Sequence, residues 1–371
     1  MINSVSLYNF KCFSEKKDID LARITILYGH NGRGKSSFSQ ALLLIAQSMK
    51  ERNDLDQLSI VGDMVKLDTF ADIKTVGSKQ KELKFWINTD KEIVEMGFSP
   101  FTDKPQLGRL SSLIYNGEDR FVVQTTTQPA AAGSEGGKVA FSTSDINVLQ
   151  QLKNIVYISA GRIGPVNDVI RNDSIPSNDI GTKGENLLNA LSHQSSDFIV
   201  YVGHCLSKIL GGASVLVPDP KATRLELLLN SRDDNQLFHP VNVGFGYSYV
   251  LPIIVGTLLA ENGSMVIIEN PEAHLHPGAQ SRIMEFLIDQ SNNKDLQLII
   301  ETHSDHVVNG MRIAMKKGNL KPNESIIQHF AFSEQVSAPI ITKITSDAKG
   351  NLSDYPEDFQ DEWTSQMLEL I

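Results

Sequence analysis

Short runs of branched apolar residues recur along the chain and alternate with longer segments of helical periodicity. The runs are too short for helices and are bounded by glycine or polar residues, which favours buried strands. They lie at 24–28, 154–159, 265–269 and 296–301. Apolar residues spaced for one helix face occupy 36–50, 184–210, 248–260, 278–290 and 304–317. This alternation predicts an α/β fold with a mixed, mostly parallel sheet flanked by helices.

Between about 51 and 145 the pattern changes to half-buried strands. The segments 81–88, 91–98 and 120–127 are typical of exposed antiparallel strands, and 125–138 is a loop of small residues. Further strands are expected as a hairpin within 213–230 and in the tail. The sequence therefore predicts an antiparallel β lobe beside the α/β part.

Composition narrows the class of protein. The 371 residues are 41% hydrophobic and 21% charged, as in ordinary globular proteins, and the net charge is −10. An acidic surface repels phosphates on average, so DNA is a partner that the charge does not support. Cys12 and Cys205 are not spaced for a disulfide framework or zinc, and no apolar run approaches the ~20 residues of a membrane span. A cytoplasmic protein without a signal peptide or membrane partner is expected.

One motif carries specific chemistry. Residues 29–36 fit the phosphate-loop pattern G-x-x-x-x-G-K-[ST], between a predicted strand and an amphipathic helix. Its glycines let backbone N–H groups face phosphate oxygens, Lys35 reaches the β- and γ-phosphates, and Ser36 binds Mg²⁺. ATP and Mg²⁺ are therefore the expected cofactors. The expected ATP-binding residues are Gly29, His30, Asn31, Gly32, Arg33, Gly34, Lys35 and Ser36.

A phosphate loop needs a carboxylate for its metal ion, usually at the end of a buried strand. Glu269 ends the run 265–269 and is the expected metal-side residue, although many strands simply end in a surface acid. His303 follows the run 296–301, where it could sense the γ-phosphate or be structural. His274 and His276 lack a third metal ligand nearby and are expected to pack at a corner.

Several segments resemble a known group of ATPases. Residues 9–13 and 24–37 resemble the start of ABC-type ATPases of the SMC and RecF group. Residues 267–277 and 299–308 resemble the Walker B and switch-histidine segments of the OLD-type ATPases. The resemblance implies a P-loop NTPase of the ABC-ATPase-head type.

Two more segments resemble one bacterial subgroup. Residues 241–254 resemble its variant ABC signature, and 347–362 its short C-terminal module of unassigned function. By this resemblance, Gly244, Gly246 and Ser248 would contact the γ-phosphate held by a second subunit, and Ser37 would add a phosphate contact. The ATPase would then be a homodimer that sandwiches two ATP molecules.

The implied domain is a single bipartite one over 1–371. It comprises a Walker A half (1–50), a β-rich lobe or insertion (51–150), a signature, Walker B and switch-histidine half (151–317) and a C-terminal module (318–371).

The sequence departs from the group's pattern at the catalytic position. Asn270 stands where a catalytic glutamate usually follows the Walker B acid, and an amide cannot take a proton from water. Either Glu272 substitutes or hydrolysis is slow. Tyr249 replaces a common glutamine, and no convincing Q-loop glutamine is found. The expected catalytic residues are Lys35, Glu269, Glu272 and His303.

These features leave several functions open. The first is a slowly hydrolysing, ATP-gated dimeric switch in anti-phage or anti-plasmid defence. Because no coiled coil or Toprim nuclease is found, a separate nuclease or toxin would be its effector. The alternative is a RecF-like DNA-binding repair ATPase, and a third is a nucleotide-binding module without turnover. Arg162 is a phosphate contact or a salt-bridging turn residue. A basic cluster is expected to be a solvated face; it consists of Arg312, Lys316, Lys317 and Lys321.

Overall fold

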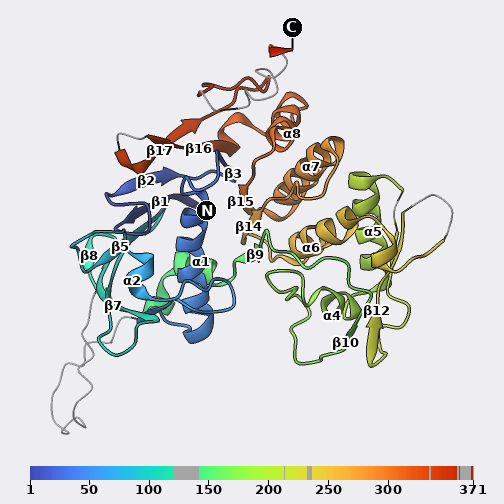
Figure 1. Cartoon of the computed structure of the whole chain (residues 1–371), viewed down its shortest axis with the longest axis horizontal. Helices are drawn as coiled ribbons and strands as arrows, with labels where there is room; N and C mark the ends of the chain where they lie inside the picture. The colour runs from blue at the N-terminus through green and yellow to red at the C-terminus, as the bar shows by residue number, and fades with distance from the viewer. Residues whose placement is uncertain are drawn as a thin grey trace.

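The fold of this chain, a computed structural model, contains two large sheets with helices between and around them (Figure 1), and two small sheets of two strands each. The structure describes residues 1–120, 142–212, 214–231, 236–333, 336–356, 359 and 369–370. Most of the predicted strand 120–127 and the whole predicted loop 125–138 lie outside the described residues.

The central sheet has six strands and matches the predicted mixed, mostly parallel sheet. Its order is β17 (Val336–Ile344), β16 (Ser325–Ser333), β3 (Ile24–Tyr28), β15 (Gln297–Glu301), β14 (Met265–Glu269) and β9 (Val156–Ile158). All neighbours pair in parallel except β17, which is antiparallel to β16. Parallel strands are usually covered on both faces, and these apolar runs are buried throughout.

Alternate residues of each central strand supply two separate cores. On β3, Ile24 and Ile26 pack with the helices α5 to α8, whereas Leu27 packs with α1 and the second sheet. The helices on the first face are α5 (Ser196–Leu210), α6 (Phe245–Leu259), α7 (Pro277–Lys294) and α8 (Asp305–Lys316). Those on the second face are α1 (Lys35–Arg52) and α3 (Asn147–Lys153).

The second sheet is the predicted antiparallel lobe, but it also takes in the start of the chain. Its order is β2 (Lys17–Asp20), β1 (Ile2–Tyr8), β5 (Leu83–Thr89), β6 (Ile93–Pro100), β7 (Leu107–Tyr115) and β4 (Gln57–Ser59), and β8 (Glu118–Asp119) pairs with β7. The buried Gln297 of β15 joins the sheets: its side chain accepts from the Ile2 N–H and donates to the Ile2 and Ala22 carbonyls.

Short elements complete the molecule. The segment 184–210 forms two helices, α4 (Leu187–Ser192) and α5, because Ser195 caps α5 by accepting the Phe198 N–H. The segment 213–230 is not one hairpin: β11 (Ser214–Leu216) pairs with β13 (Leu228–Asn230), while β12 (Arg224–Glu226) pairs with β10 (Asp168–Ile170). A short α2 covers Phe70–Ile73, and 3₁₀ turns cover Thr143–Asp145, Pro240–Asn242 and Pro322–Glu324. Within the described residues, none of the helices has the length and apolar character of a membrane span.

Candidate nucleotide-binding site

The loop between β3 and α1 has the backbone shape of a phosphate cradle. Gly29, Gly32 and Gly34 all have positive φ, at 131°, 74° and 106°. A Cβ at Gly29 would lie 2.2 Å from the carbonyl oxygen of Phe330 on β16, so that position admits only glycine. The loop leads directly into the N-terminus of α1, whose free N–H groups attract anions.

Lys35 lies across this loop. Its side chain is buried, and Nζ donates to the carbonyl oxygens of Gly29 at 2.7 Å and His30 at 2.8 Å. Burial lowers the pKa of Lys35, and the negative charges of Glu301 and Glu272 oppose that shift. The ammonium is thus positioned inside the cradle, where phosphate oxygens would meet it.

Ser36 points at an acid that the sequence analysis did not single out. Its hydroxyl donates to Oε1 of Glu301, at the end of β15, over 2.8 Å. Burial, with the charge of Glu269 nearby, raises the pKa of Glu301 to about 6, while the bond from Ser36 and the charge of Lys35 lower it. A signal was present in the sequence, because both neighbouring strands end in glutamate.

Glu269 lies one strand further from the loop. It is in register with Glu301 across β14 and β15, and its Oε2 accepts the N–H of Ala160 at 3.0 Å. It therefore belongs to the same carboxylate group at the end of the sheet. Among the described residues no bond between Glu269 and Ser36 is found, so the metal role predicted for Glu269 stays a prediction.

Arg162 contacts backbone carbonyls in the described structure, and the phosphate contact considered for it stays a prediction. Its guanidinium is buried and donates to three carbonyl oxygens, those of Ser159, Glu269 and Asn270, at 2.7–2.9 Å. Burial lowers its pKa to about 10, against the opposing charge of Glu272. As placed, Arg162 holds together the loops that follow β9 and β14.

Glu272 and His303 connect the loops that follow β14 and β15. Glu272 accepts the Thr302 hydroxyl at 2.8 Å through Oε2 and the His303 N–H at 2.9 Å through Oε1. Burial together with the charge of Lys35 lowers the pKa of the His303 imidazole, against an opposing interaction with the Gly29 backbone. His303 thus lies near the phosphate loop, and its role as a γ-phosphate sensor stays a prediction.

The backbone conformation at position 270 favours asparagine. The φ of Asn270 is 45°, in the left-handed region that asparagine tolerates better than glutamate, and its N–H donates to the Glu301 carbonyl at 2.8 Å. The usual catalytic position is therefore occupied by a residue suited to the turn.

The signature segment packs against the loop after β14. A Cβ at Gly246 would lie 3.0 Å from the His274 carbonyl oxygen, and the Tyr249 and His274 rings are 4.3 Å apart. Gly244 is exposed and precedes the first turn of α6. Ser248, by contrast, is only 8% exposed, and its buried hydroxyl has no hydrogen-bond partner among the residues that the structure describes. A contact from Ser248 to another subunit's phosphate would require this turn to move.

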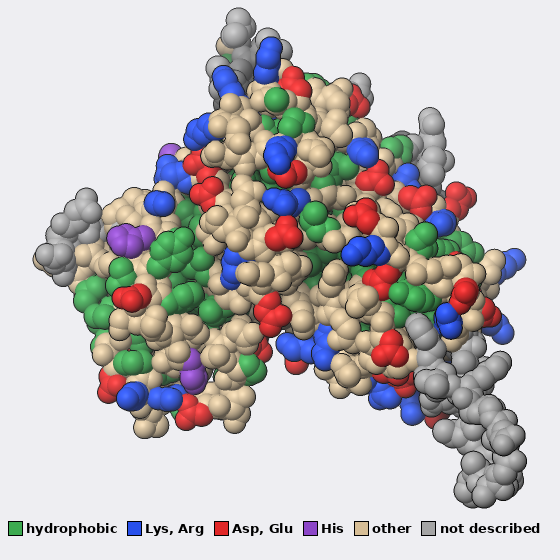
Figure 2. Space-filling view, turned by 180° about the vertical axis from the view of Figure 1, so that it is seen from behind, with side chains coloured by type: hydrophobic (Ala, Val, Ile, Leu, Met, Phe, Trp, Pro, Cys, Tyr) green, Lys and Arg blue, Asp and Glu red, His purple; other side chains and the backbone are tan. Residues whose placement is uncertain are grey.

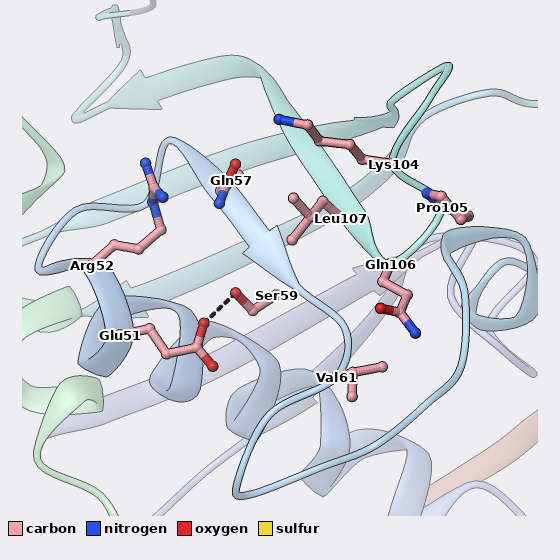
Figure 3. Close-up of a pocket in the computed structure, with 9 residues that line it drawn as sticks. All are labelled: Glu51, Arg52, Gln57, Ser59, Val61, Lys104, Pro105, Gln106 and Leu107. Carbon is pink, nitrogen blue, oxygen red and sulfur yellow. Dashed lines mark hydrogen bonds between the residues drawn. The ribbon is translucent and has the colours of Figure 1, made fainter.

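Ser37 directly follows the phosphate loop, and the other candidate features lie away from it. Burial raises the pKa of the Cys12 thiol, against an opposing interaction with the Ser37 side chain. In the basic cluster, Arg312 donates to the Gly350 carbonyl, Lys317 pairs with Glu285 and Lys321 pairs with Glu324. A pocket of about 600 Å³ lies at the far end of α1, between that helix, β4 and the loop before β7. Figure 3 shows the residues that line it. The described residues hold no group of three or more His, Cys, Asp or Glu arranged to bind a metal.

Together, the strand, glycine loop, lysine and serine define a P-loop nucleotide-binding protein. Comparisons with known proteins agree. Residues 1–155 match the model of an AAA ATPase domain, and residues 152–309 match an AAA domain whose description names the AbiEii toxin of type IV toxin–antitoxin systems. Residues 321–370 match DUF3696, a family of unknown function.

Individual relatives are distant. The chain is 24% identical over 351 residues to an "ATP/GTP phosphatase" of Helicobacter pylori (strain ATCC 700392 / 26695), covering 83% of this chain and 86% of that protein. An Smc head bound to the C-terminal winged-helix domain of ScpA has a TM-score of 0.54 at 15% identity, covering 93% of this chain and 97% of the other. An Smc head derived from Pyrococcus furiosus, bound to the C-terminal domain of ScpA, has a TM-score of 0.53 at 13% identity, covering 100% and 98%.

The chain thus carries AAA-family ATPase domains over residues 1–155 and 152–309, followed by a segment that matches DUF3696. Its fold is similar to that of SMC heads.

Proposed function

We propose that this ATPase is an ATP-gated switch that dimerises around two Mg·ATP molecules. The observation that carries the proposal is the placement of Lys35, whose buried ammonium bridges the Gly29 and His30 carbonyls inside the glycine cradle. The residues present fit the nucleotide, because backbone N–H groups, the α1 N-terminus and Lys35 converge where a triphosphate would lie. Mg²⁺ would neutralise phosphate charge, with Ser36 as one ligand.

Hydrolysis in this switch is slow. Asn270 cannot accept a proton from water, and both oxygens of Glu272 already accept hydrogen bonds from Thr302 and His303. Asn270 is therefore not a general base, and the two hydrogen bonds that Glu272 accepts make it a weaker one, because they stabilise its charged form. Slow turnover suits a switch whose bound state has to last.

The signature surface supports dimerisation. Val241 and Phe245, which flank Gly244, are 55% and 56% exposed, so apolar side chains surround the N-terminus of α6. An exposed helix N-terminus binds anions, and an apolar rim around it favours burial against a second protein surface. A second copy with bound ATP would supply both the anion for the helix N-terminus and a protein surface that buries the apolar side chains.

We also propose a role in bacterial anti-phage or anti-plasmid defence, in the cytoplasm, with a separate nuclease or toxin as effector. The support is the match of residues 152–309 to a domain description that names a toxin–antitoxin system. Direct DNA binding is less favoured, because the net charge is −10 and Figure 2 shows basic side chains interspersed with acidic ones on the face it displays.

The test measures molar mass in solution over a range of protein concentrations, with and without Mg·ATP. The wild-type chain should shift from monomer to dimer when Mg·ATP is added, because the nucleotide completes the interface. Lys35→Ala should stay monomeric, whereas Lys50→Ala, at the far end of the same helix, should behave as wild type. A wild-type mass that ATP leaves unchanged at every concentration would contradict the switch.

A further inference from the structure

The carboxylates at the end of the central sheet are not equivalent toward a metal ion. We propose that Glu301, at the end of β15, is the protein carboxylate that holds the nucleotide's Mg²⁺ together with Ser36. Glu269, at the usual Walker B position, would instead position the loop after β9. This inference rests on the proposed binding of Mg·ATP and assigns its metal ligands.

Strand order places Glu301 closest to the phosphate loop. β15 lies directly beside β3, with Glu301 in register with Leu27, two residues before Gly29. Glu269 lies on the next strand out, in register with Glu301. Because neighbouring strands are about 4.8 Å apart, the Glu269 backbone is roughly twice as far from β3 as that of Glu301.

The Ser36 hydroxyl and Glu301 already have the separation of two metal ligands. Mg²⁺ binds oxygens at about 2.1 Å in octahedral geometry, which puts adjacent ligands about 3.0 Å apart. Ser36 Oγ and Glu301 Oε1 are 2.8 Å apart. An ion could therefore replace the bridging proton with little movement of either side chain.

One carboxylate oxygen of Glu301 is buried without a hydrogen-bond donor among the described residues. Its side chain is only 6% exposed, and Oε2 is buried without a hydrogen bond in the described part of the chain. A buried carboxylate oxygen in that state costs free energy that a cation, or a water bound to one, would recover. Oε2 of Glu269, in contrast, already accepts the Ala160 N–H.

Calorimetry of ATP binding to the full chain separates the two acids. Each protein is titrated with ATP in excess Mg²⁺ and in EDTA, and the ratio of the two affinities is the gain from the metal. Glu301→Gln keeps the shape of the side chain and an acceptor for Ser36. In this variant the ratio of the two affinities should be smaller than in wild type by about tenfold or more. Glu269→Gln should retain most of it, and Glu285→Gln, which removes a charge from an exposed ion pair with Lys317, should match wild type.

The outcomes are distinct. A metal gain lost in Glu269→Gln but kept in Glu301→Gln overturns the assignment and leaves ATP binding intact. Absence of ATP binding by wild type in both buffers overturns the proposed function itself.

A crystal of the wild-type chain with ATP and Mn²⁺ decides the question even if a variant misfolds, because the anomalous signal of manganese locates the ion. Direct or single-water contact with Glu301 supports the assignment, and contact with Glu269 alone refutes it.

Discussion

At the scale of single residues, the site is dominated by charges removed from water. Lys35 and Glu301 are both buried at the end of the sheet. Burial lowers the pKa of Lys35 and raises that of Glu301, which favours the neutral form of each side chain. Their mutual attraction opposes both shifts. In the nucleotide-free site the charged form of Glu301 is therefore unfavourable, and a bound metal ion would stabilise it.

The pH dependence of stability should reveal this carboxylate. The pKa of Glu301 is raised to about 6 from 4.5, so the folded chain binds the proton more tightly than the unfolded chain does. Stability should then fall as pH rises through the window from 4.5 to 6, by about 2 kcal/mol, and no penalty remains below 4.5. Glu301→Gln should lack this fall.

Urea unfolding of nucleotide-free protein at several pH values measures the difference between wild type and variant. A difference that does not change across the window would contradict the raised pKa.

At the scale of elements, the loops after β14 and β15 act as one unit because Glu272 joins them. The carboxylate accepts two hydrogen bonds from the neighbouring loop, one of them from the backbone of His303. The orientation of His303 thus depends on Glu272, in the loop after β14.

Glu272→Ala should destabilise the chain by about 2–3 kcal/mol, since two donors lose a charged acceptor. Amide hydrogen exchange at His303 should become faster than in wild type. Glu285→Ala is the control, because it breaks an exposed ion pair with Lys317 and should cost no more than about 1 kcal/mol. Unchanged protection at His303 would show that the loops are held by other contacts.

At the scale of the whole molecule, one sheet divides two hydrophobic cores. The strand β16, inside the segment that matches DUF3696, pairs directly with β3, so the C-terminal module is part of the ATPase sheet. The antiparallel lobe is tied to the same sheet by the Gln297 side chain, which bonds the backbone of Ile2 and Ala22.

Replacing Gln297 should therefore loosen the two sheets from each other. Gln297→Met keeps the volume but leaves buried backbone groups unpaired, which should cost about 2–4 kcal/mol. Gln328→Met, which removes one bond to the Asp20 carbonyl, should cost about 1 kcal/mol. Thermal unfolding with probes in each sheet measures both, and a Gln297→Met loss no larger than that of Gln328→Met would argue against the link.

Local sequence determined the central strands and the phosphate loop. The runs 24–28 and 265–269 are the observed β3 and β14, because branched apolar residues bounded by glycine or acid specify a buried strand without reference to the rest of the chain. Glycine spacing likewise set the loop, since positive φ is a property of single residues.

Tertiary structure alone decided which side chains meet. Strand order inserts β15 between β3 and β14, and so brings Glu301, not Glu269, to the Ser36 hydroxyl. It also draws the first strands of the chain into the antiparallel lobe and turns Arg162 onto backbone carbonyls. These are contacts between residues more than a hundred positions apart or between whole sheets, and periodicity along the chain carries no information about them.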